Sequence, residues 1–92
     1  MAKTIRPDER VLRRKLAWLM NTYHITAGHC VHYCPKGEEI GRFRFNNLRR
    51  QHQFDTRLLP IITPGILTLA RLRGHEGGIE TTQEEPIKPD EP

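Results

Sequence analysis

An apolar stripe in residues 7–23, PDERVLRRKLAWLMNTY, constrains the fold more than any other feature of this chain. Its members recur at intervals of four, three and four residues: Leu12, Leu16, Leu19 and Tyr23. That spacing places them on one face of an α-helix. Pro7 suits the first helical turn, because its missing N–H has no partner there anyway. We predict a long amphipathic helix over residues 7–23 with this stripe in the core.

The middle of the chain has the two-residue period of a β-strand. Arg42 and Arg44 alternate with Phe43 and Phe45, which is typical of a strand with one basic and one apolar face. The preceding CPKGEE has proline and glycine in the order that a tight turn requires. We therefore predict a β-hairpin from about Cys30 to Phe45.

The C-terminal half is predicted to be helical. Asn47 can cap a short helix, and Asp55 or Thr56 can cap a turn before Pro60. Thr63 followed by Pro64 is a start signal for a last helix that ends at Gly74. The segment 58–72 is the most apolar part of the chain and should pack on the first helix. These segments predict a single α+β domain over residues 1–74.

Charge divides the chain into a basic body and an acidic tail. Residues 1–74 carry 14 Lys or Arg and 5 Asp or Glu, whereas residues 75–92 carry one Lys and six acids. The tail lacks hydrophobic periodicity, so we predict that it is disordered. It either solubilises the protein or competes with a polyanion for the basic body.

Both cysteines and three of the five histidines fall in residues 24–39, HITAGHCVHYCPKGEE. In a regular strand Cys30 and Cys34 would be separated by about 13 Å. Two thiolates that share a zinc each lie about 2.3 Å from it, so a regular hairpin excludes the site.

Two alternatives would permit the site. The chain could curl into a loop at Gly28 to Cys30, or a short helix over residues 26–34, capped by Thr26, would bring the two cysteines within one turn of each other. The metal hypothesis is a structural zinc held by four ligands: His24, Cys30, Cys34 and His52. The competing interpretation is that the cysteines are small, half-buried residues and the histidines are surface rings.

Catalysis and membrane insertion are not expected. The cysteine pair is one residue too widely spaced for a redox C-x-x-C motif, and a body of this size has little room for a closed pocket. We predict that the protein is not an enzyme and has no small-molecule substrate. No apolar run approaches the roughly 20 residues of a membrane span, and MAKTIRPDER has no apolar signal core. We therefore expect a cytoplasmic protein.

Arginines form the remaining functional lead. The guanidinium group matches phosphates and carboxylates with two parallel hydrogen bonds. Three clusters are predicted to contact nucleic acid or another partner: Arg10, Arg13 and Arg14; Arg42 and Arg44; Arg49 and Arg50.

We predict a small regulatory module that binds nucleic acid, mainly through phosphates. The alternative is an adaptor or inhibitor, of the kind that phages use, which docks on a host protein such as a nucleic-acid-processing enzyme. Phosphate binding should weaken steeply with salt, and a packed protein interface much less.

Overall fold

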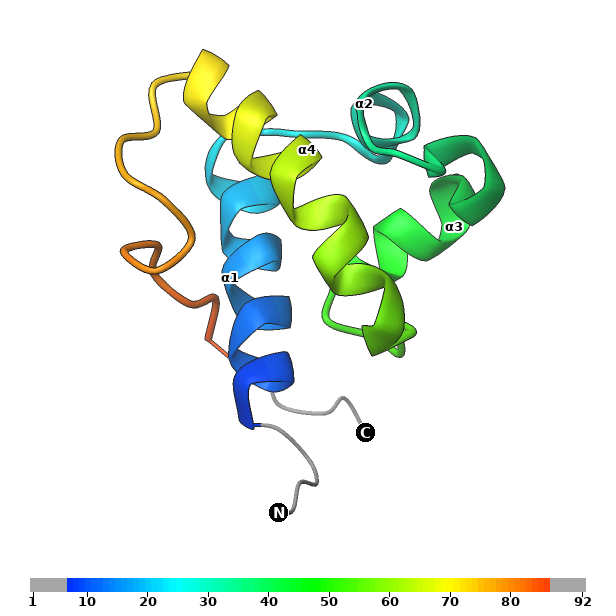
Figure 1. Ribbon diagram of the computed structural model, residues 1–92, viewed down its shortest axis with the longest axis horizontal. Coiled ribbons are helices and arrows are strands. Elements are labelled where there is room, and N and C mark those ends of the chain that lie inside the picture. The colour runs from blue at the N-terminus through cyan, green and yellow to red at the C-terminus, as the bar shows by residue number, and fades with distance from the viewer. Residues whose placement is uncertain (1–6, 87–92) are drawn as a thin grey trace.

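The computed structural model describes residues 7–86, which form four α-helices and no strand. The elements are α1 (Pro7–Thr22), α2 (Ala27–Tyr33), α3 (Gly37–Arg49), a 3-10 turn at Thr56–Leu58, and α4 (Leu59–Leu72). In Figure 1, α4 crosses in front of α1, and α2 and α3 lie together on the side of α4 away from the last segment of the chain. The predicted α+β class is therefore wrong, and the fold is all-helical.

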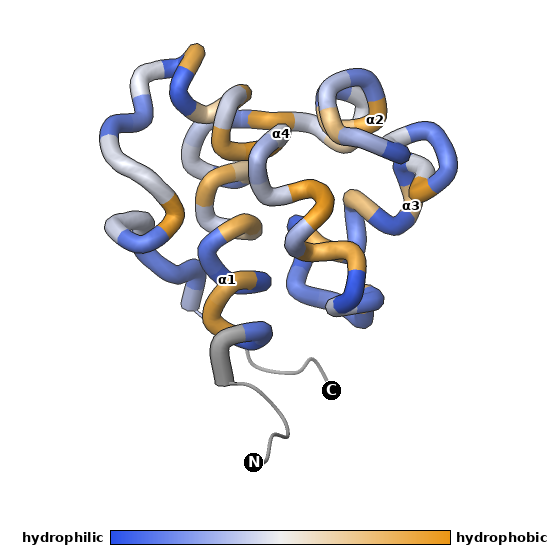
Figure 2. The backbone as a smooth tube through the Cα atoms, viewed as in Figure 1, coloured by the Kyte–Doolittle hydropathy of each residue, from blue (hydrophilic) through white to orange (hydrophobic). Residues whose placement is uncertain are grey.

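The core lies between α1 and α4, and α2 and α3 close it. The predicted first helix is confirmed, and its stripe residues Leu16 and Leu19 are completely buried. From α4, Ile62 and Ile66 are equally buried, and Figure 2 shows α4 as one of the most hydrophobic stretches of the chain. Burial of such side chains contributes roughly 1.5–3 kcal/mol each. None of the helices within residues 7–86 is both long and apolar enough to span a bilayer.

The last helix begins earlier than its sequence signal predicts. It starts at Leu59, with Pro60 in its first turn and Pro64 in its interior. Proline inside a helix removes one backbone hydrogen bond. In the turn that precedes Pro64, the hydroxyl of Thr63 donates a hydrogen bond of 2.6 Å to the backbone carbonyl of Leu59.

The predicted hairpin is replaced by α2 and α3. Thr26 caps α2, because its hydroxyl accepts from the backbone of His29 and its own N–H donates to the His29 ring. This is the short helix that the sequence offered as an alternative. In a helix, residues two apart point in nearly opposite directions. Phe45 is consequently fully buried, whereas the side chain of Phe43 is 76% exposed.

Of two further predicted caps, one is wrong and one is confirmed. Asn47 lies inside α3 rather than capping a helix, while Asp55 caps the 3-10 turn as predicted. Gly41 interrupts α3 with φ 86° and ψ 156°, a conformation that favours glycine. The helix is therefore kinked, and its second half, residues 42–49, carries the basic residues.

Residues 75–86, here called the strap, return along α1 (Figure 1). His75 and Thr82 are buried, and the His75 ring lies between the hydroxyls of Tyr23 at 3.3 Å and Thr82 at 3.2 Å. Trp18 meets this ring edge-on, with centroids 6.3 Å apart. The prediction of a disordered tail is therefore wrong for residues 75–86, because their buried side chains pack on α1. Residues 87–92 lie outside the described part of the chain.

Candidate nucleic-acid interface

The outer face of α3 presents most of the predicted contact residues. Phe45 and Leu48 point into the core, so the helical repeat of about 100° per residue directs the intervening side chains outward. The outward residues are Arg42, Phe43, Arg44, Asn46, Asn47 and Arg50. Phe43 and Arg50 lie near the middle of this face, and Arg42 and Arg44 lie at its two edges.

A basic hollow adjoins the Arg42 edge of α3. Thr26, Gly28 and Asn46 line it together with Arg42 and Arg49. The Nε atom of Arg49 is enclosed and has no hydrogen-bond partner within residues 7–86. Because two guanidinium-bearing side chains, Arg42 and Arg49, line the hollow, it suits an anionic oxygen.

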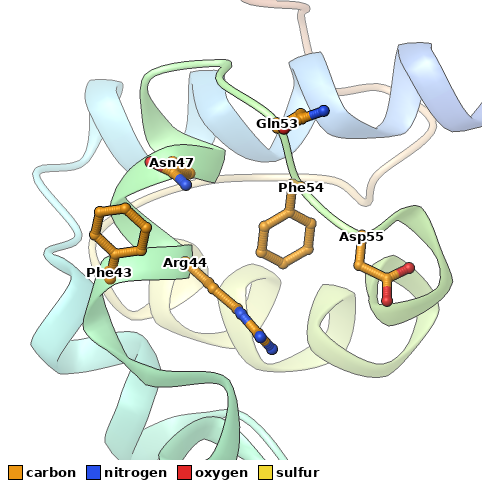
Figure 3. Close-up of a pocket in the computed structure, with 6 residues that line it drawn as sticks. All are labelled: Phe43, Arg44, Asn47, Gln53, Phe54 and Asp55. Carbon is orange, nitrogen blue, oxygen red and sulfur yellow. The ribbon is translucent and has the colours of Figure 1, made fainter.

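A second hollow adjoins the Arg44 edge, and its chemistry is mixed. Figure 3 shows Phe43, Arg44 and Asn47 projecting from α3, and Phe54 and Asp55 from the segment that follows it. Arg57 donates to both carboxylate oxygens of Asp55, from Nε and a terminal nitrogen, each at 3.0 Å. These bonds, the backbone N–H of Arg57 and the charge of Arg44 lower the pKa of Asp55 below its ordinary value. Asp55 is therefore an ionised acceptor near neutral pH.

The α1 arginines are less available than those of α3. Arg14 pairs with Glu84 of the strap at 2.8 Å, and its carbonyl accepts from the backbone of Glu85 at 3.0 Å. Arg13 has an enclosed Nε without a partner among residues 7–86, while Arg10 is exposed. The strap thus covers part of the basic face predicted on α1, and the α3 face stays open.

The structure brings the two cysteines together, but not the histidines predicted to join them. Cys30 lies in α2 and Cys34 directly follows it, and both are buried; the Cys34 thiol donates to the carbonyl of Ile62 at 3.7 Å. Their mutual hydrogen bond, helped by burial, raises the pKa of the Cys30 thiol. His24 and His52 are exposed. Across the described residues 7–86, no group of three or more His, Cys, Asp or Glu side chains could hold a metal ion.

The residues that sequence reasoning missed are Gln53 and Phe54. They lie in a connection without periodicity, and only the tertiary fold places them against α3. Of the two phenylalanines of α3, Phe45 is buried, whereas Phe43 is exposed and available for contact with a ligand.

In comparisons with known proteins, no family model, no curated protein and no solved structure is significantly similar to this chain. The arginine face and its two hollows are therefore interpreted from their own chemistry.

Proposed function

We propose that this protein is a small non-enzymatic regulatory module that binds nucleic acid through the outer face of α3. The observation that supports it is the exposure of Arg42 and Arg44 on α3 and of Arg50 directly after it, none of them in an ion pair with another described residue. Arginine forks bind phosphate oxygens in pairs, and unpaired arginines on one face raise the local concentration of a polyanion. Arg49 also lines the basic hollow at the edge of this face.

The proposal assigns the residues different parts. Arg42, Arg44 and Arg50 contact phosphates, and Arg49 contributes through the basic hollow. The surface extends along α1 through Arg10, Arg13 and Arg14. Arg14 already forms an ion pair with Glu84. Binding of this kind is mainly electrostatic and weakly sequence-specific.

Removal of two α3 charges tests the proposal. The variant Arg42→Gln with Arg50→Gln should lose at least about tenfold in affinity for a labelled oligonucleotide, because two phosphate contacts disappear. The slope of log affinity against log salt on a single strand should become shallower by about 1.4. Fluorescence anisotropy at several salt concentrations measures both quantities, and circular dichroism checks that the variant folds.

The matched control is Lys36→Gln with Arg71→Gln. Both side chains are exposed, and Lys36 lines a different hollow, beside Glu38 and Glu39. This pair removes the same net charge and should leave the salt slope nearly unchanged. Equal losses in the two double variants would reduce the interaction to net charge and contradict a site on α3.

Docking on a host protein is the competing proposal, and the exposure of Phe43 favours it, since aromatic and arginine side chains are enriched at protein interfaces. Wild-type protein that binds no oligonucleotide at low salt, but binds a protein partner with little salt dependence, would establish that alternative. A structural zinc is a separate proposal. It requires His24 or His52 to come close to Cys30 and Cys34.

A further inference from the structure

The hollow beside Arg44 differs from an ordinary phosphate site. It is lined by six residues: Phe43, Arg44, Asn47, Gln53, Phe54 and Asp55. A phosphate needs donors only, as the hollow beside Arg42 supplies. Here a carboxylate stands in the same hollow as the guanidinium (Figure 3), so a second negative charge is disfavoured near Asp55. The ligand should therefore be anionic at one end and a hydrogen-bond donor at the other.

The aromatic side chains add an apolar requirement. Phe54 is half-buried and packs against the core, which fixes its ring. Phe43 is 76% exposed. Removal of a phenyl ring from water is favourable, so this ring would gain free energy if it were covered. Both rings line the same hollow and come from different elements. A flat ligand that stacks on Phe43 would bury the ring and gain this free energy.

Three polar side chains that line the hollow can form hydrogen bonds with the edge of a flat ligand. The side-chain amides of Asn47 and Gln53 each donate and accept, and Asp55 only accepts. Arg57 holds the Asp55 carboxylate in place with two hydrogen bonds of 3.0 Å. Amide and carboxylate groups are the side chains that pair with the edges of nucleobases.

We propose that this hollow receives one unpaired nucleobase of a single strand, stacked on Phe43, with Arg44 on an adjoining phosphate. The inference rests on the proposed function and adds to it the class of nucleic acid. Bases in a duplex have both faces covered by their neighbours, so a duplex can use the arginines but not the ring. The protein should therefore prefer single strands, and that preference should depend on Phe43 rather than on charge.

The experiment compares Phe43→Ala, Phe43→Tyr and wild type against a labelled single strand and the duplex of the same sequence. Stacking of one base on an aromatic side chain is worth about 1–3 kcal/mol, or roughly 5- to 150-fold. Phe43→Ala should lose at least about fivefold on the single strand, with an unchanged salt slope. Its duplex affinity should stay within about twofold, and Phe43→Tyr should restore single-strand binding.

Leu72→Ala is the control for a general loss of exposed apolar surface. Leu72 is 68% exposed at the far end of α4 and should have no effect on either ligand. A second readout uses the three phenylalanines as internal probes in a spectrum of ring-labelled protein. Titration with the single strand should shift the ring signals of Phe43 and Phe54 and leave that of buried Phe45 in place.

The outcomes separate the two proposals. Wild-type binding that Phe43→Ala leaves unchanged, or weakens equally for single strand and duplex, overturns the base site and leaves the α3 phosphate face standing. An absence of binding to both ligands at low salt overturns the proposed function as well. Shifts at all three rings would indicate a general change in structure and also contradict the base site.

Discussion

Gly65 of α4 packs directly against Tyr33 and Cys34 at the C-terminal end of α2. A Cβ atom built on it would lie 2.8 Å from the Cys34 sulfur and 3.0 Å from the Cys34 Cα atom. The second contact involves backbone, so the two helices themselves would have to separate. Gly28 offers a contrast within α2, because the nearest atom to its Cβ would be 3.7 Å away. One residue is thus a glycine for packing reasons, and the other is not.

We expect Gly65→Ala to lower the free energy of unfolding by about 1–2 kcal/mol. Overpacking costs about 1–3 kcal/mol, and the better helix propensity of alanine returns only about 1 kcal/mol. Gly28→Ala should be neutral or stabilising by up to about 1 kcal/mol, because only the propensity term applies. Urea denaturation curves measure both variants. A Gly65→Ala protein as stable as wild type would show that α2 is not packed on α4 as described.

At the level of elements, the sequence predicted those helices whose apolar spacing is uninterrupted. The stripe of α1 has no break, and its helix was predicted almost to the residue. In α3 the buried apolar side chains are those of Ile40, Phe45 and Leu48, and the kink at Gly41 lies within the five-residue interval between the first two. A five-residue interval matches no helix face, so the local alternation of Phe and Arg dominated and indicated a strand.

The prediction of the candidate site was limited in the same way. The arginines could be named as candidates because charge is visible in any secondary structure. Their predicted grouping was wrong, since Arg42 and Arg44 would share one face of a strand but lie at opposite edges of the α3 face. Phe54 joins them only through the path of the chain after α3.

The two cysteine thiols already have partners within the protein. Both thiols are buried and hydrogen-bonded, with Cys34 on the carbonyl of Ile62 in α4. We expect a chelator to leave the helical circular dichroism and the thermal midpoint unchanged. Native mass spectrometry of untagged protein, before and after chelation, accompanies the measurement. A stoichiometric zinc whose removal unfolds the chain would support the four-ligand hypothesis and require a different arrangement around α2.

On the scale of the whole molecule, the strap connects the end of α4 to the beginning of α1. Besides the Arg14–Glu84 pair, Lys15 donates to the carbonyl of Glu80 at 3.3 Å and Gln51 to that of Pro86 at 2.8 Å. The acidic segment thereby occupies part of the basic surface in the folded monomer. A polyanion that extends from α3 onto α1 would have to displace Glu84.

Loss of this competition should be measurable. We expect Glu84→Gln to raise single-strand affinity by about two- to threefold at low salt, as an exposed ion pair is worth about 0.2–1 kcal/mol. The gain should vanish at high salt, which screens exposed charges. Glu76→Gln removes the same charge from an exposed residue of the strap and serves as the control. Equal gains from both substitutions would indicate a net-charge effect and contradict a specific contact with Arg14.

The edge-on contact between Trp18 and His75 gives the protein a built-in optical reporter. The chain contains a single tryptophan, so its emission comes from one known environment. That indole adjoins the ring with which the strap begins, at a centroid distance of 6.3 Å. Emission from an indole changes when a neighbouring imidazole is replaced by water. Detachment of the C-terminal segment is therefore visible in unlabelled protein, in real time and without any added dye.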